Sequence, residues 1–93
     1  MENNNIIKLR KKLDLLDNKF LNLIKKRSIL INKILEEKTS KNQIVDRKRI
    51  KIILNQIRKK SVRNKIDPMI TNKIWKNMIL AYIDYERRNF KKK

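Results

Sequence analysis

The chain has no cysteine, no histidine and no glycine, and its 93 residues include a single proline. The lack of cysteine and histidine excludes disulfide bonds, thiolate nucleophiles, Cys/His zinc sites and imidazole general bases. The lack of glycine excludes the glycine-rich loops that bind nucleotide phosphates. The side chains left for chemistry are carboxylates, amines, guanidiniums, hydroxyls and amides.

Long apolar runs are missing as well. No segment approaches the roughly 20 apolar residues that span a bilayer. The first residues, MENNN, lack the charged and then apolar layout of a signal peptide. We therefore expect a cytoplasmic protein with no membrane partner. A chain of this length fits one domain with a thin hydrophobic core.

Acidic residues are scarce: 9 stand against 27 basic residues, which gives a formal net charge of +18. Such a charge is typical of proteins that bind nucleic acid by displacing counterions. However, 19 Lys, 12 Asn and 16 Ile fill 47 of the 93 positions, and their codons can be written almost entirely in A and T. We favour compositional drift as the source of much of the charge over a selected polyanion-binding surface. The eight arginines are then the more informative cations.

An apolar stripe with one misfit runs along the first third of the chain. Its members recur in steps of four and three, as on one face of an α-helix: Leu9, Leu13, Leu16, Phe20, Leu23, Arg27, Leu30 and Ile34. Because arginine cannot lose its proton, a buried Arg27 needs an anionic partner. Lys38 follows eleven residues later, within roughly 20° of the same direction.

The periodicity predicts three helices and a basic tail, over residues 6–38, 46–60, 68–89 and 90–93. A polar loop over residues 39–43 and a charged connection over residues 61–66 separate the helices. Asp67 supplies an N-cap and Pro68 a first helical residue. The first helix would be about 50 Å long, so it cannot bury its stripe alone. The spacing of the stripe favours pairing with a second copy of the chain.

The shorter helices have apolar faces of their own, formed by Ile50, Ile53, Leu54 and Ile57 and by Ile74, Trp75, Met78, Ile79 and Tyr82. Four residues after Tyr82 comes Glu86, so a carboxyl group lies on the apolar face of the third helix. Arg27 and Glu86 are thus two polar residues on apolar stripes.

Each of these residues also has a structural explanation. Arg27 could pair with Glu86 in a buried salt bridge, and Lys38 could complement the dipole at the end of its helix. Arg47 could be a solvated charge in the first turn of the second helix, and Tyr82 a core aromatic. Arg10 lies 17 residues before Arg27, about 25 Å along the helix, so the two would share a small ligand only across a dimer.

The motif Leu9-Arg10-x-x-Leu13-Asp14-x-x-Asp17 is followed by Arg27, Lys38, Arg47, Asp67 and Glu86. This order resembles that of the all-α chorismate mutases of bacteria, and the resemblance covers residues 6–90. Its specific part is the spacing of Arg10, Arg27 and Lys38.

The resemblance implies an intertwined homodimer of three-helix chains with two equivalent active sites. It also implies the Claisen rearrangement of chorismate to prephenate, on the route to phenylalanine and tyrosine. This reaction is unimolecular and needs no nucleophile, metal or other cofactor. The enzyme would hold the dianionic substrate in a compact conformer and stabilise charge on the breaking ether oxygen.

The resemblance assigns a role to each cation. Arg27 and the partner subunit's Arg10 would clamp the two substrate carboxylates. Lys38 would donate a hydrogen bond to the ether oxygen. Arg47 would lie near the ring hydroxyl, and the backbone around Ile44 would line the same side.

Three positions depart from the family pattern. Lys48 replaces a glutamate that accepts from the ring hydroxyl, and Tyr82 replaces a serine that contacts a carboxylate. Glu86 replaces a glutamine that helps to bind the ether oxygen. A carboxyl group there must be protonated, or be neutralised by a cation. Our hypothesis is that Glu86 donates as a neutral acid, which makes it catalytic together with Lys38 and Arg27.

Two alternatives remain. Isochorismate-pyruvate lyases share this fold and its cations, lack the glutamate at the position of Lys48, and can carry tyrosine at that of Tyr82. We favour the mutase, with chorismate as the substrate, because it is the commoner activity and a nearly universal biosynthetic need. A basic helical protein that binds nucleic acid is the more distant alternative, and we do not expect nucleic acid to be the partner.

Overall fold

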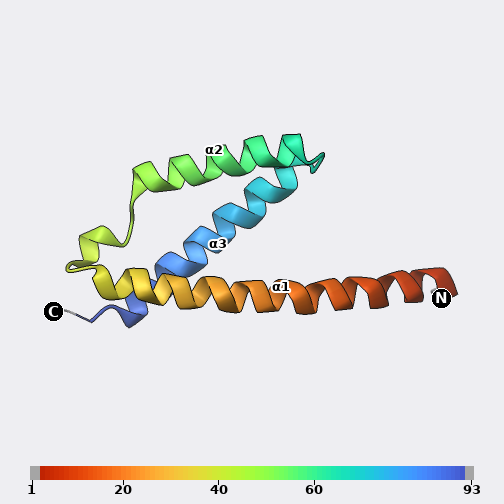
Figure 1. The fold of residues 1–93 in the computed structure, drawn as a ribbon, viewed down its shortest axis with the longest axis horizontal. Coiled ribbons are helices and arrows are strands. Elements are labelled where there is room, and N and C mark those ends of the chain that lie inside the picture. Colours follow the sequence, from red (N-terminus) through yellow and green to blue (C-terminus); the bar gives the residue numbers. More distant parts are fainter. Residues whose placement is uncertain (1–2, 92–93) are drawn as a thin grey trace. The chain divides into compact units, whose positions relative to one another are not determined.

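The computed structural model describes residues 3–91, which form three α-helices and one turn of 3₁₀ helix (Figure 1). The elements are α1 (Asn4–Glu37), η1 (Lys41–Gln43), α2 (Arg47–Arg63) and α3 (Pro68–Asn89). The described residues contain no strand. The prediction of an all-α chain with three helices is therefore confirmed. Lys92 and Lys93 of the predicted tail lie outside the described residues.

The chain divides into two compact units, residues 1–33 and residues 34–93. The first unit contains most of α1. The second contains the end of α1 together with η1, α2 and α3. None of the helices within residues 3–91 combines the length and apolar character that crossing a bilayer demands.

In the first unit, α1 begins two residues before the predicted start. Asn3 explains the earlier start, because its side-chain Oδ1 accepts a hydrogen bond from the backbone N–H of Ile6 at 2.9 Å. The apolar stripe is not buried within the single chain: its members are 48–58% exposed at Leu9, Leu13, Leu16, Phe20, Leu23 and Leu30. Arg27 lies on the same stripe and is also exposed.

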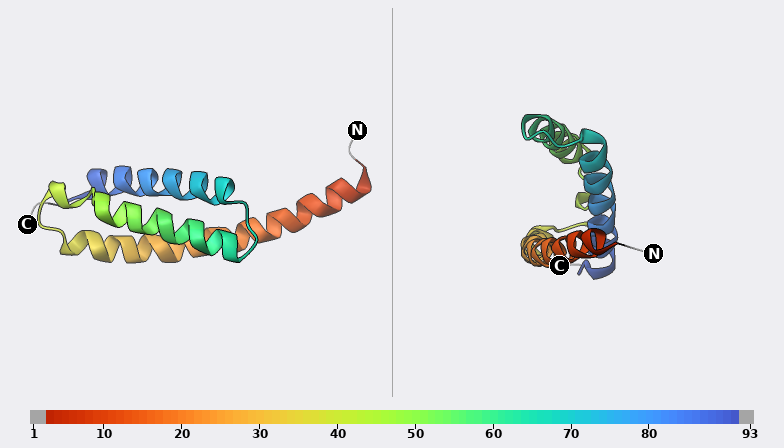
Figure 2. Two further views of the ribbon diagram at one scale, coloured as in Figure 1. Left: turned by 90° about the horizontal axis from the view of Figure 1, so that it is seen from above. Right: turned by 90° about the vertical axis from the view of Figure 1, so that its right-hand side faces the viewer.

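In the second unit, α2 and α3 form an antiparallel hairpin (Figures 1 and 2). The predicted apolar positions of α2 are all half-buried, as are Trp75, Met78, Ile79 and Tyr82 of α3. Ile74 is 39% exposed, so its prediction as a buried residue is wrong. At about 100° per residue, Ile74 lies at the edge of the face that the other four share. Buried apolar side chains are few among residues 3–91: Leu35 and Ile44.

A buried polar contact joins α2 to α3. Ser61 was predicted to begin the connection between the helices, but α2 continues to Arg63. Ser61 is 3% exposed, and its Oγ donates to the carbonyl of Ile57 at 2.6 Å. The same Oγ lies 2.7 Å from Oγ1 of Thr71 on α3. A hydroxyl pair therefore occupies a place that an apolar contact fills in most helix hairpins, and both hydroxyls have partners.

The turn between α2 and α3 contains a residue in the left-handed conformation that is not glycine. Lys65 has a φ of 59°, and its N–H donates to the carbonyl of Val62 at 3.2 Å. The N–H of Ile66 donates to the carbonyl of Ser61 at 2.8 Å. These two bonds form a Schellman motif, which usually has glycine at the position of Lys65. Asp67 then caps α3 by accepting from the N–H of Met69 at 2.9 Å.

Glycine at position 65 should stabilise the protein. A left-handed conformation costs a residue with a Cβ atom roughly 1–2 kcal/mol, so we expect Lys65→Gly to raise the free energy of unfolding by about 1 kcal/mol. Lys59→Gly, in the interior of α2, is the control and should lower it by about 1 kcal/mol. Urea unfolding measures both. A loss of stability in both variants would contradict this account of the turn.

Candidate functional site

The site begins where α1 ends. Lys38 was predicted to lie in the last turn of the first helix, but α1 ends at Glu37 and its last turn contains no basic residue. The N–H of Lys38 donates to the carbonyl of Leu35 at 3.1 Å, a tightened bond of the 3₁₀ type. Lys38 is therefore the first residue of the loop, and its side chain extends past the end of α1 toward α3.

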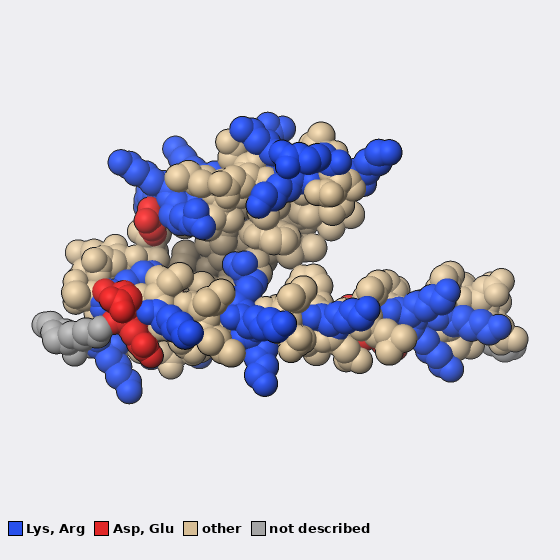
Figure 3. Space-filling model, viewed as in Figure 1, with Lys and Arg blue, Asp and Glu red and all other residues tan. Residues whose placement is uncertain are grey.

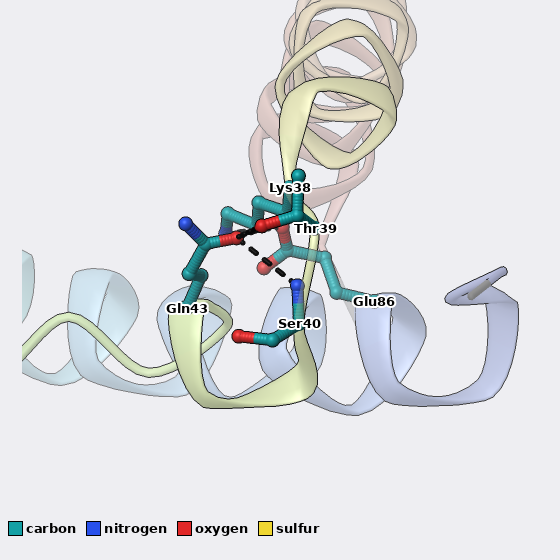
Figure 4. A network of polar contacts seen from close by, with 5 residues as sticks. All are labelled: Lys38, Thr39, Ser40, Gln43 and Glu86. Atoms are coloured by element: carbon teal, nitrogen blue, oxygen red, sulfur yellow. Dashed lines mark hydrogen bonds and ion pairs between the residues drawn. The ribbon is translucent and has the colours of Figure 1, made fainter. Parts of the chain in front are cut away.

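The loop after Lys38 is shaped by the side chain of Gln43. Its Oε1 accepts from the backbone N–H of Thr39 at 2.6 Å and from that of Ser40 at 3.2 Å (Figure 4). The next residue, Ile44, is 4% exposed and anchors the end of the loop. These contacts fix the backbone between Lys38 and α2, so the residues on either side of the loop are held at defined positions.

Lys38 forms an ion pair with Glu86 on α3. Its Nζ donates to Oε1 of Glu86 at 2.8 Å, and Glu86 points toward Lys38 in Figure 4. The side chains are 18% and 7% exposed, respectively. An ion pair so withdrawn from water is screened less than a surface pair. The sequence suggested Arg27 as a partner of Glu86; within the second unit that partner is Lys38.

A pocket of about 780 Å³ opens beside this ion pair. It lies between the loop, the first turn of α2 and the last turns of α3. Its lining residues are Lys38, Asn42, Gln43, Val45, Asp46, Arg47, Lys48 and Arg87. Three residues that the sequence placed in the site, Lys38, Arg47 and Lys48, are thus brought together in one cavity.

The pocket has an excess of positive charge. Four of its lining residues are cationic, and one, Asp46, is acidic. Asp46 is engaged at the start of α2, where its Oδ1 accepts from the N–H of Arg49 at 3.0 Å. Within residues 3–91, Arg47, Lys48 and Arg87 form no ion pair. Such a pocket favours a small anionic ligand.

The remaining predicted residues occupy different places. Ile44 does not line the pocket; its side chain is buried, and its N–H already donates to the carbonyl of Lys41 at 3.1 Å. Tyr82 is half-buried on α3, one helical turn before Glu86. Arg10 and Arg27 lie on the part of α1 that belongs to the first unit, and both side chains are exposed.

Sequence reasoning missed five lining residues: Asn42, Gln43, Val45, Asp46 and Arg87. The first four adjoin the predicted residues in sequence, so a broader window around Arg47 would have included them. Arg87 directly follows the predicted residue Glu86, but its residue type does not distinguish it from Arg88, because both are basic residues of the last turn of α3.

The fold and the pocket define the class of protein: a small all-α protein with a pocket lined mainly by cationic and polar residues. Among the residues described, no cluster of acidic side chains could hold a metal ion. The chain matches the chorismate mutase type II family over residues 9–87. Comparisons with curated proteins and with solved structures give no match. The matched region includes every lining residue of the pocket, and the chain belongs to the chorismate mutase type II family.

Removing Glu86 should destabilise the second unit. Glu86→Ala leaves Lys38 largely buried without its counter-charge, so we expect the free energy of unfolding to fall by about 2 to 3 kcal/mol. Glu86→Gln keeps an oxygen acceptor for Lys38, so its free energy of unfolding should fall less than that of Glu86→Ala. Chemical denaturation measures both changes.

The exposed ion pair of Asp84 and Arg88 offers a matched control. Its atoms are 2.9 Å apart, close to the 2.8 Å of the Lys38–Glu86 pair, but the side chains are 70% and 64% exposed. Asp84→Ala should therefore cost about 0.5 kcal/mol or less. Equal losses for Glu86→Ala and Asp84→Ala would show that burial adds nothing to the Lys38–Glu86 pair.

Proposed function

We propose that the protein is a chorismate mutase that converts chorismate to prephenate. The observation that carries this proposal is the cationic pocket in a chain of this family. The reaction breaks a C–O bond and forms a C–C bond within one molecule, so it needs no nucleophile and no cofactor. What it needs is a site that holds a dianion in a compact conformer and favours negative charge on the departing ether oxygen.

In this proposal, Lys38 donates to the ether oxygen. An ammonium group has three N–H bonds, and the bond to Glu86 uses one of them, so donors remain for the substrate. The ion pair fixes the position of Lys38, which lowers the cost of ordering it when the substrate binds. Glu86 holds the ammonium of Lys38 through Oε1 and so directs it toward the ether oxygen. Donation by Glu86 itself would require a neutral carboxyl group, which the ion pair with Lys38 opposes.

Arg27 and the partner subunit's Arg10 bind the substrate carboxylates in a homodimer. The exposed stripe of α1 supports this assembly, because contiguous apolar surface is normally covered by a partner. The alternating steps of the stripe fit pairing with a second α1. Guanidinium groups suit the role, since each can bind a carboxylate through two parallel hydrogen bonds.

Arg47 and Lys48 would lie toward the ring hydroxyl of the substrate, and the backbone near Ile44 would line the same side. Tyr82 occupies the position at which a serine of the family contacts a carboxylate. Lys48 lines the pocket, so an amine stands where the mutases have an acceptor for the ring hydroxyl. This observation makes isochorismate-pyruvate lyase the second candidate function on the same site.

The function can be tested directly with purified protein. We expect chorismate to disappear and prephenate to form, while isochorismate is left intact. Arg27→Ala removes a carboxylate contact and should lower kcat/KM by about a hundredfold. Arg58→Ala, an exposed cation on α2, is the charge-matched control and should leave kcat/KM unchanged. Turnover of isochorismate alone would replace the mutase by the lyase, and turnover of neither compound would reject both.

The shared site can be tested by complementation. Arg10→Ala and Arg27→Ala should each be nearly inactive as homodimers. A heterodimer of the two has one site with both arginines and one with neither, so an equal mixture refolded together should recover about a quarter of the wild-type activity. If both arginines came from one chain, no heterodimer site would be intact and activity would stay at the level of the variants.

A further inference from the structure

Arg87 is the contribution of α3 to the lining of the pocket. Lys38, Asn42, Gln43, Val45 and Asp46 come from the loop and its end, and Arg47 and Lys48 come from the first turn of α2. Arg87 reaches the cavity from the last turn of α3. A ligand in the pocket would thus have a guanidinium on its α3 side as well as on its α2 side.

Arg87 and Arg88 differ sharply in their surroundings, although they are neighbours of the same residue type. Nε of Arg88 donates to Oδ2 of Asp84 at 2.9 Å, and its guanidinium lies 5.9 Å from the ring centroid of Tyr85. Arg88 does not line the pocket. Arg87 has no carboxylate partner among residues 3–91 and faces the cavity. Contacts within α3 therefore give Arg88 a counter-ion, whereas Arg87 has none among residues 3–91.

Helix geometry separates Arg87 from the ion pair next to it. Successive residues of a helix differ in direction by about 100°. Glu86 is 5% exposed and is held by Lys38, whereas Arg87 is exposed. Replacing Arg87 should therefore leave the ion pair and the fold in place.

The cations of the pocket repel one another when no anion lies between them. Arg47, Lys48 and Arg87 converge on the cavity from two helices, and the carboxylate of Asp46 is engaged in capping α2. Solvent screens this repulsion while the pocket is empty. A bound anion removes the repulsion and gains charge-assisted hydrogen bonds.

We propose that Arg87 is a substrate-binding residue that forms a bidentate contact with a carboxylate of the ligand. The proposal rests on the proposed function for the identity of the substrate, a cyclic dicarboxylate. Arg87 would thus add a third guanidinium contact to the substrate, beside those of Arg27 and the partner subunit's Arg10. A lysine at position 87 would attract the same carboxylate, but its ammonium lacks the planar fork that fixes the orientation of the carboxylate.

Steady-state kinetics with chorismate test the proposal. Arg87→Ala should raise KM by about ten- to a hundredfold, with a smaller effect on kcat. Arg87→Lys should fall between this variant and the wild type. Arg88→Ala should leave KM unchanged, and thermal unfolding should show that all three variants are folded. If KM is unchanged in Arg87→Ala, the proposal is overturned and the mutase function stands.

A titration with malonate separates the two proposals. Malonate is a small dicarboxylate whose binding does not depend on turnover, and calorimetry can measure it on the intact protein. If the wild type converts neither chorismate nor isochorismate, the proposed function fails. The role of Arg87 in binding a carboxylate is then still supported if malonate binding is lost in Arg87→Ala and kept in Arg88→Ala. Equal malonate binding by these two variants would overturn its role.

Discussion

The ion pair between Lys38 and Glu86 is the contact around which the site is built. It joins the first residue after α1 to the last turns of α3, and both side chains are largely withdrawn from water. Burying a carboxylate or an ammonium without a counter-charge costs free energy, and each of these two residues offsets that cost for the other. With the pair in place, the loop residues and the first turn of α2 can form a pocket whose remaining cations have no ion partner among residues 3–91. The same contact thus supports the fold of the second unit and leaves the pocket with an excess of positive charge.

The absence of glycine has a structural consequence: side-chain hydrogen bonds shape the turns of this chain. Gln43 accepts from two backbone N–H groups in the loop, and Asp46 caps α2. Lys65 takes a left-handed conformation that glycine would adopt without strain. Because Gln43 and Asp46 also line the pocket, the bonds that shape the backbone also limit which polar groups a ligand can meet. Loop conformation and site chemistry are therefore coupled in these two residues.

The sequence predicted those features that depend on local patterns. Apolar spacing indicated the three helices, and Asp67 with Pro68 indicated the start of α3, because caps and periodicity act over a few residues. Lys38, Arg47 and Lys48 were assigned to the site by resemblance, and the pocket brings them together. Features that depend on distant partners were not predictable in this way. The polarity of Ser61 suggested a connection, but its burial depends on Thr71, ten residues further along the chain. The i,i+4 spacing of Asp84 and Arg88 is a local signal, but the place of Arg87 beside the cavity depends on residues 38–48, far away along the chain.

The high net charge has to be interpreted in the light of these contacts. Lys and Arg side chains are spread along α1 and α2 on the face shown in Figure 3, and acidic groups there are few. Compositional drift, which we favour as the source of much of the charge, would not determine which of the cations have counter-ions or line a cavity. On a solvated helix face, water and salt screen the interaction with an anion. In a pocket that a ligand fills, the ligand displaces water and several cations act on it at once. For this reason a few cations around the Lys38–Glu86 pair carry more functional meaning than the larger number spread over the surface.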